Sequence, residues 1–264
     1  MPRVWKISFT VLVLILVGLL VFSGYMAFQE ALDQKKDKEV FDELAKLVET
    51  PVREEASRLP YIVATDDLEN RAEEQETEET EAAPSRRNLT PLFEQNTDFL
   101  GWLCIPDTAV NYPVVHTPAD PERYLHLNFY GEYSASGVPF LDHRCVTGSD
   151  NLIIYGHNMK NGTIFGSLKQ YLNKSYLAEH PIIEWETSAG CERYAVFAVA
   201  VVKKSDSWYS FISADGTTDW GAYILRKATL TTELVPTPGQ KFLTLSTCYG
   251  SGEDGRLLVI AAKI

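Results

Sequence analysis

Between residue 89 and the C-terminus, the chain consists of short apolar runs separated by Gly, Pro, Asn and Asp. Each run has the length and the β-branched or aromatic content typical of a strand. The eight runs are GWLCI from Gly101, YPVVH from Tyr112, GVPFLD from Gly137, NLIIYGH from Asn151, PIIEW from Pro181, RYAVFAVAVV from Arg193, KFLTLSTC from Lys241 and RLLVIAAK from Arg256. Helical patches at residues 161–172 and 219–228 interrupt them, without regular strand–helix alternation. The pattern predicts a mostly antiparallel β-barrel with helical insertions.

A long uncharged segment lies near the N-terminus. No Asp, Glu, Lys or Arg occurs between Lys6 and Glu30, so residues 7–29 form an uncharged stretch of 23 residues. This length is sufficient to cross a bilayer as a helix. Arg3 and Lys6 precede the stretch, whereas Glu30 and Asp33 follow it. The positive-inside rule therefore predicts a cytoplasmic N-terminus and an extracellular location for the rest of the chain.

A cleaved signal peptide is the alternative for this segment. The small residues Ser23, Gly24 and Ala27 offer a cleavage region, but the apolar part of a signal peptide is usually shorter. We therefore expect a single-pass protein of the cell membrane. In this interpretation residues 1–6 are a cytoplasmic tail and residues 7–28 are a transmembrane anchor.

Residues 29–88 are expected to form a stalk. Apolar residues recur at helical spacing before Pro51 and predict an amphipathic helix that packs on the later domain or on a partner. These residues are Val40, Phe41, Leu44, Leu47 and Val48. Farther on, residues 66–81 hold nine acids against one base, Arg71, and almost no large apolar residue. Such a composition predicts a charged, extended and disordered tether.

The remaining length and composition fit one compact domain at residues 89–264. The chain has 264 residues and 45% hydrophobic content, which is enough for one substantial core. The net charge is -12, and the acidic run supplies eight of these charges. No basic patch with interleaved aromatic residues occurs, so nucleic acid is not an expected partner.

The last two apolar runs place a thiol beside a guanidinium. Cys248 ends the run KFLTLSTC, and the loop from Tyr249 to Gly255 contains three glycines and is short enough for a hairpin. This hairpin would set Arg256 next to Cys248, at a strand separation of about 5 Å. A guanidinium at that distance stabilises a thiolate and can donate to an oxyanion. Alternatively, the Cys is a small buried apolar residue and the Arg an edge-strand residue.

A thiol nucleophile needs a base, and His157 is the best candidate. The run NLIIYGHNM is an apolar strand that ends in Gly-His-Asn, so the imidazole projects from a strand end as Cys248 does. A solvated loop histidine is the alternative. The other histidines lie beside a strand, in a polar loop or beside turns, and are interpreted as structural or solvent-facing: His116, His126, His143 and His180.

Four blocks in this order resemble class B sortases, the membrane-anchored cysteine transpeptidases of Gram-positive surfaces. The blocks are GWLCIPDTAVNYPVVH, GVPFLDHR, NLIIYGHNM and LTLSTC, the last followed by an Arg eight residues on. The resemblance covers about residues 92–264, and residues 205–232 resemble the helical insertion of this class. It implies a closed eight-stranded β-barrel as the catalytic domain, with His157, Cys248 and Arg256 as its catalytic residues.

The resemblance also implies the reaction. Cys248 would attack a carbonyl in the C-terminal sorting signal of a secreted protein and form a thioester. An amine of a cell-wall precursor or of another surface protein, such as a pilin, would then resolve that thioester. No metal or other cofactor is expected, because no acidic cluster matching the calcium site of class A relatives can be placed in the sequence.

Three further residues are candidates for substrate binding. Tyr155 and Ser246 each stand two residues before a catalytic candidate and share its face of the strand. Asn128 lies in the block YLHLNF, which resembles a substrate-contacting region of the family. Structural roles are the alternative for all three residues. The other cysteines have no metal-ligand spacing and are expected to be buried thiols, although an extracellular location permits one disulfide: Cys104, Cys145 and Cys191.

Two other classes of function stay open at this point. A surface cysteine endopeptidase would use the same thiol, but the papain order of Cys before His is not present here. A non-catalytic surface-binding module would explain the anchor and the stalk, but not three reactive residue types at strand ends. An added amine nucleophile distinguishes a transpeptidase from an endopeptidase.

Overall fold

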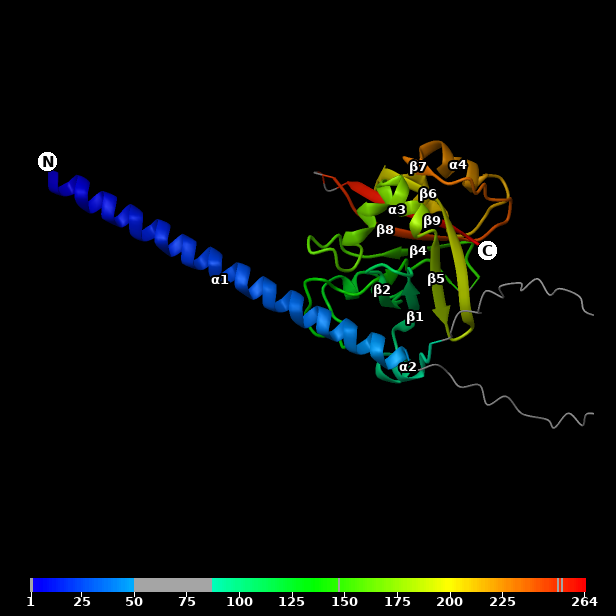
Figure 1. Cartoon of the computed structure of the whole chain (residues 1–264), viewed down its shortest axis with the longest axis horizontal. Helices are drawn as coiled ribbons and strands as arrows, with labels where there is room; N and C mark the ends of the chain where they lie inside the picture. The colour runs from blue at the N-terminus through cyan, green and yellow to red at the C-terminus, as the bar shows by residue number, and fades with distance from the viewer. Residues whose placement is uncertain (1, 50–86, 147, 251, 253) are drawn as a thin grey trace, which may run out of the picture.

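The computed structural model describes residues 2–49, 87–146, 148–250, 252 and 254–264, with only the backbone of residues 2–11. Within these residues, nine strands form one sheet in the order β5-β1-β2-β3-β4-β8-β9-β6-β7, and a further pairing of β5 with β6 closes it (Figure 1). The strands are β1 (Phe99–Cys104), β2 (Asn111–Val115), β3 (Phe140–Leu141), β4 (Asn151–Tyr155), β5 (Ile182–Thr187), β6 (Gly190–Lys203), β7 (Leu230–Thr231), β8 (Phe242–Cys248) and β9 (Gly255–Lys263). Eight strands therefore close the barrel, while β7 pairs only with β6.

The predicted closed eight-stranded barrel is confirmed, and each of the eight apolar runs overlaps one of its strands. Most neighbours are antiparallel, as expected, but β2–β3 and β4–β8 are parallel pairs. The two-residue strand β7 was not predicted, because a segment this short has no periodicity to detect. The parallel pair β4–β8 matters for function because it aligns the ends of two strands that carry candidate residues.

Short helices interrupt the barrel strands. Both predicted patches are helical in part: η2 (Gly166–Leu172) is a 3-10 helix and α4 (Trp220–Lys227) is an α-helix. The Asp219 side chain caps α4 by accepting a hydrogen bond from the backbone N–H of Ala222. The remaining short elements are α2 (Thr90–Gln95), α3 (Lys174–Glu179), η1 (Arg123–Leu125) and η3 (Ser207–Ser210).

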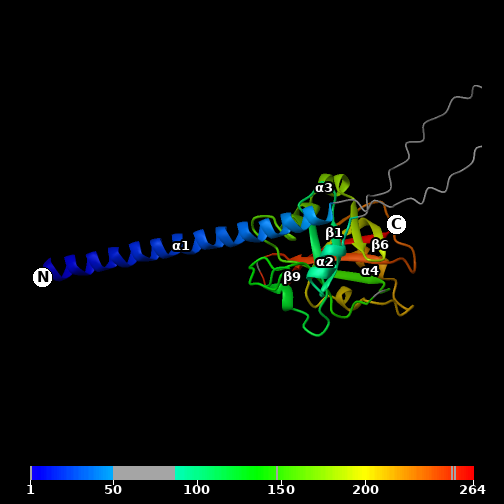
Figure 2. The ribbon, with the colours of Figure 1, turned by 90° about the horizontal axis from the view of Figure 1, so that it is seen from below.

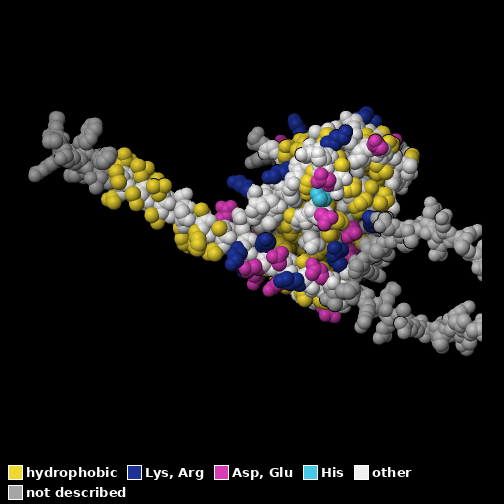
Figure 3. All heavy atoms as spheres, viewed as in Figure 1, with side chains coloured by type: hydrophobic (Ala, Val, Ile, Leu, Met, Phe, Trp, Pro, Cys, Tyr) yellow, Lys and Arg dark blue, Asp and Glu magenta, His cyan; other side chains and the backbone are white. Residues whose placement is uncertain are grey.

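Helix α1 (Pro2–Val48) is a single helix of 47 residues. It joins the expected membrane anchor and the expected amphipathic helix without a break (Figures 1 and 2). Away from the barrel, residues 12–28 of the helix expose mostly apolar side chains, including Leu14 and Phe22 (Figure 3). Among the described residues, this helix is the one candidate membrane span by length and composition.

The C-terminal end of α1 packs against the barrel. Phe41, Leu44 and Val48 are buried in the main core, and the Phe41 ring meets Tyr112 edge-on with 5.0 Å between centroids. The predicted amphipathic helix therefore covers apolar surface of the barrel itself. The predicted acidic tether lies outside the described residues.

Strand β8 is buried on both faces. Leu243 and Leu245 belong to the core inside the barrel. Phe242 belongs to a second core on the outer face, where Trp208 and Phe211 from the insertion between β6 and β7 cover the sheet. Its exposed C-terminal residue, Cys248, is thus carried by a strand held between two packed layers.

Candidate active site

Strand pairing places Cys248 between His157 and Arg256. In the parallel pair β4–β8, Tyr155 is aligned with Ser246, so His157 and Cys248, each two residues farther on, leave the same edge of the sheet. In the antiparallel pair β8–β9, Cys248 is directly opposite Arg256. Neighbouring strands are about 5 Å apart, so the predicted hairpin and the strand-end histidine meet at one site.

Close backbone packing holds the ends of β4 and β8 together. The Gly156 N–H donates to the Ser246 carbonyl at 3.2 Å, and the Thr247 hydroxyl donates to the Gly156 carbonyl at 2.7 Å. A Cβ on Gly156 would lie 2.8 Å from the Phe165 ring, so glycine permits this approach. The Asn158 amide donates to the Cys248 carbonyl at 2.8 Å and fixes the backbone of the exposed thiol.

The His157 ring is held from two sides. Its Nε2 lies 2.9 Å from the Leu125 carbonyl, and since a carbonyl can only accept, Nε2 carries a proton. The His126 ring stacks on it, with 5.5 Å between centroids and 28° between planes. Burial lowers the pKa of His157 below its usual value, the Leu125 bond acts in the opposite direction, and His126 lowers it further. A second proton is therefore gained at Nδ1 at a lower pH than in an ordinary histidine.

A pocket of about 850 Å³ opens beside these residues. It is lined by five of the six candidate site residues, namely Tyr155, His157, Ser246, Cys248 and Arg256. Cys248, at the edge of the pocket, is exposed, whereas His157 and Arg256 are half-buried. The structure therefore brings an exposed thiol, an imidazole and a guanidinium to the wall of one cleft.

Asn128, the sixth candidate, is not among the residues that line this pocket. It is buried, and its side-chain oxygen accepts hydrogen bonds from the backbone N–H groups of Tyr130 and Glu132 at 3.0 and 2.9 Å. In this structure Asn128 holds a turn, and a contact with substrate stays a prediction from the family resemblance.

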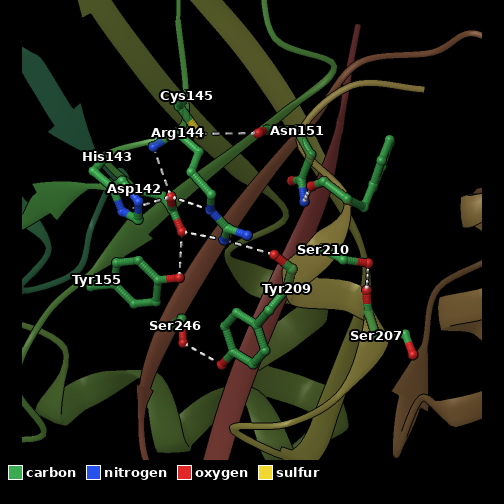
Figure 4. A network of polar contacts seen from close by, with 11 residues as sticks. Asp142, His143, Arg144, Cys145, Asn151, Tyr155, Ser207, Tyr209, Ser210 and Ser246 are labelled. Atoms are coloured by element: carbon green, nitrogen blue, oxygen red, sulfur yellow. Dashed lines mark hydrogen bonds and ion pairs between the residues drawn. The ribbon is translucent and has the colours of Figure 1, made fainter. Parts of the chain in front are cut away.

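Sequence reasoning missed a polar network that forms one wall of the pocket (Figure 4). Arg144 donates through Nε and Nη2 to both oxygens of Asp142, at 2.9 and 2.7 Å, and through Nη2 to the Tyr209 carbonyl at 2.7 Å. The Tyr155 hydroxyl donates to Asp142 at 2.8 Å, and the Tyr209 hydroxyl lies 2.7 Å from Ser246 Oγ. The network ties the insertion to β4 and β8 around the site.

The ionisation states of this wall are well defined. Burial raises the pKa of Asp142, but the hydrogen bonds from Arg144 and Tyr155 outweigh this effect and hold the pKa below its usual value. Burial raises the pKa of Tyr209 to about 12. At neutral pH the wall therefore presents a paired carboxylate and a neutral phenol. The block GVPFLDHR, which contains Asp142, was the available signal, but no periodicity connects it with Tyr209.

The other cysteines lie outside the pocket lining, and the structure pairs none of the four cysteines in a disulfide. Cys104 and Cys145 are buried, as expected, whereas Cys191 is half-buried. Burial raises the pKa of Cys145 and of Cys191 to about 11 in each case. These thiols are therefore poor nucleophiles at neutral pH.

Comparison with known proteins identifies the class to which this fold and site belong. Residues 103–264 match the model of the sortase domain family, and this match covers more than half of the chain. The chain therefore belongs to the sortase family and is a sortase-type cysteine transpeptidase.

The relatives are class B enzymes. The sortase B of Listeria monocytogenes serovar 1/2a is 31% identical over 256 residues, which are 94% of this chain and 93% of the relative. The crystal structure of sortase B from B. anthracis in complex with AAEK1 matches with a TM-score of 0.68 and 26% identity, covering 88% of this chain and 98% of that one. A Staphylococcus aureus sortase B–substrate complex matches with a TM-score of 0.61 and 28% identity, covering 67% and 84%.

Proposed function

We propose that the enzyme cleaves the C-terminal sorting signal of a secreted protein through a thioester on Cys248 and transfers that protein to an amine. The observation that carries this proposal is the strand pairing that sets Cys248 between His157 and Arg256 at a cleft. A thiol beside a base and a directed cation is the combination that covalent acyl transfer needs.

The steps follow from the chemistry of these three groups. The Cys248 thiol gives its proton to His157, and the sulfur attacks the carbonyl carbon of the scissile peptide bond. Arg256 donates to the oxyanion that forms. As the C–N bond breaks, His157 returns the proton to the leaving amine, and the acyl group stays on sulfur as a thioester. The incoming amine then attacks this thioester, loses its proton to His157 and releases the Cys248 sulfur.

The sorting-signal peptide is proposed to bind in this cleft. Tyr155 and Ser246 line it next to the catalytic candidates, and we assign them to substrate binding. One relative has been solved as a sortase B–substrate complex, which supports a sorting-signal peptide as the partner here. The acceptor amine is proposed to belong to a cell-wall precursor or to another surface protein.

The experiment that tests the proposal uses the full chain in detergent micelles and a library of sorting-motif peptides. We expect cleavage of a subset of the library and, with an added oligoglycine amine, a ligated product at the expense of the hydrolysed one. Cleavage without any ligated product at saturating amine would instead identify a surface cysteine endopeptidase.

The pH dependence of turnover should follow the lowered pKa of His157. In the active free enzyme, the Cys248 sulfur and His157 Nδ1 share one transferable proton, and a further proton on Nδ1 stops proton transfer from the thiol. Because burial lowers the pKa of His157, the acid limb of kcat/KM should be centred below about 6.5, the usual value for histidine. A pH profile of kcat/KM for one library peptide measures this; an acid limb centred above pH 6.5 would contradict it.

We also propose an orientation in the membrane. The apolar part of α1 and the basic residues before it support residues 1–6 as a cytoplasmic tail, 7–28 as the anchor, 29–88 as the stalk and 89–264 as the extracellular catalytic domain. Protease added to intact protoplasts of the expressing cell should remove the catalytic domain. Full protection of that domain, or its release into the medium without protease, would refute the orientation or the retained anchor, respectively.

A further inference from the structure

We infer that the docked end of α1 positions the His157 ring, with Asp37 as the positioning residue, through the loop that spans residues 123–138. The loop lies between the helix and the active site, and it contacts both. The inference rests on the catalytic role proposed above for His157. It goes beyond that role because it links the membrane-anchoring helix to the geometry of the reaction.

Asp37 is the buried acid of the helix. Its side chain is on the barrel-facing side of α1, and the residue is only 6% exposed. Its Oδ2 accepts a hydrogen bond from the Ser134 hydroxyl at 2.8 Å and a longer one from the Ser136 N–H at 3.4 Å. A buried carboxylate holds such donors strongly, because no water replaces them. The two donors lie two residues apart in the loop.

Ser134 transmits this contact into the loop. Its hydroxyl oxygen also accepts hydrogen bonds from the N–H groups of Ser136 and Gly137, at 3.2 and 3.1 Å. Its own N–H donates to the His126 carbonyl at 3.0 Å, so the two arms of the loop are joined. Orienting the Ser134 hydroxyl toward Asp37 therefore holds the returning arm of the loop against the arm that contains Leu125 and His126.

The arms of the loop are also packed tightly around Leu125. Gly137 has a φ of 61°, and a Cβ there would lie 2.5 Å from the carbonyl oxygens of both Tyr124 and Leu125. Val138 donates to the Tyr124 carbonyl at 3.1 Å. The Leu125 carbonyl that accepts the His157 Nε2–H thus has little freedom to move relative to Ser134.

Among the contacts of the described residues, a second polar contact between helix and loop is much weaker. Lys36 pairs with Glu132 at 3.1 Å, but both side chains are about 60% exposed, at 62% and 60%. Exposed ion pairs of this kind contribute little because water and salt screen them. Asp37 is therefore the polar residue of α1 on which the position of the loop depends.

The test compares variants of the full chain in detergent micelles. Asp37→Ala is expected to lower kcat about tenfold, the size expected when a catalytic group is displaced slightly, while KM changes by less than about twofold. Asp37→Asn retains an acceptor oxygen and should recover most of kcat. Ser134→Ala removes the partner on the loop and should behave as Asp37→Ala does. Lys35→Ala is the matched control, since Lys35 lies on the exposed face of the same helix and pairs only with Glu39 in the described contacts.

A spectroscopic signature separates positioning from general destabilisation. In the protein labelled with ¹⁵N-histidine, the His157 Nε2–H is protected by the Leu125 carbonyl and should give a slowly exchanging signal, assigned by its loss in His157→Ala. This signal should broaden or vanish in Asp37→Ala and Ser134→Ala, at temperatures where circular dichroism shows a folded barrel. It should persist in Lys35→Ala.

Wild-type kcat and a wild-type Nε2–H signal in Asp37→Ala would overturn the inference. If Asp37→Ala does not fold, Ser134→Ala decides by the same two measurements. The proposed function is tested separately, because it fails if His157→Ala keeps wild-type turnover. In that case the Nε2–H signal of the variants that retain His157 would still report whether Asp37 positions the ring.

Discussion

Replacing Cys248 by alanine is expected to abolish turnover while the barrel stays folded. Only the thiol can carry the acyl group as a thioester, and removal of a nucleophile typically costs on the order of a million-fold in kcat. The side chain is exposed, and the contact that fixes its backbone, from the Asn158 amide to the Cys248 carbonyl, does not involve the sulfur. The change therefore removes chemistry without removing packing.

Two measurements check this result. Peptide turnover should fall to background, and mass spectrometry of the enzyme with a cleavable peptide should show an acyl adduct on the wild type alone. Cys191→Ala is the matched control, because Cys191 is half-buried and outside the pocket, so it should retain turnover and change stability at most. Peptide cleavage that survives in Cys248→Ala would eliminate the thioester mechanism.

Arg256→Lys is expected to lower kcat/KM by roughly a hundredfold or more, the loss typical for one oxyanion donor. If Arg256 supplied only positive charge, lysine would be a fair replacement. The planar fork of a guanidinium instead allows one N–H to be anchored while others point elsewhere. Nη1 donates to the Gly255 carbonyl at 2.9 Å, and this anchor fixes the plane of the group directly opposite Cys248. A flexible ammonium cannot reproduce that direction.

Two measurements distinguish a directed hydrogen bond from Arg256 from a purely electrostatic effect of its charge. In Arg256→Lys, kcat/KM should collapse, while the pH dependence of Cys248 alkylation by iodoacetamide should shift little. Asp254, in the same loop, pairs with Lys204 at 2.9 Å, so charges of both signs already lie near the site. They reduce the effect that the single charge at position 256 has on the ionisation of Cys248. Lys203→Ala, which removes a charge at the facing end of β6, is the control and should keep normal turnover. Near-normal turnover in the lysine variant would refute a directional role for Arg256.

Much of the fold could be predicted because each strand appears in the sequence as a short apolar run. The run KFLTLSTC has alternating faces, and both faces are buried, one inside the barrel and one beneath the insertion. The sequence predicts the strand but not the second core, because Trp208 and Phe211 reach β8 only through the folded insertion. The continuity of α1 was also missed, since the charges after Glu30 mark a change of surroundings rather than a change of backbone.

In the candidate site, too, the features that depend on local sequence could be predicted, and those that depend on distant contacts could not. Cys248 and Arg256 could be paired from the length of one loop, and His157 from its place at a strand end. The wall formed by Asp142, Arg144 and Tyr209 could not, because 65 residues separate Arg144 from the carbonyl it binds. Nor could the stacking of His126 on His157, because it depends on how the loop returns to the barrel.

The unbroken helix α1 couples the height of the barrel above the bilayer to the direction in which the cleft faces, whereas a flexible linker would leave these two independent. With the apolar segment in a bilayer, each residue added between Glu30 and Asp37 lifts the barrel by about 1.5 Å and swings it by about 100° around the helix axis. On a tilted helix, this rotation decides whether the cleft faces the lipid bilayer or the surrounding cell wall. The reach of the barrel can therefore change without a change of heading only in steps near whole turns, such as about seven residues for two turns.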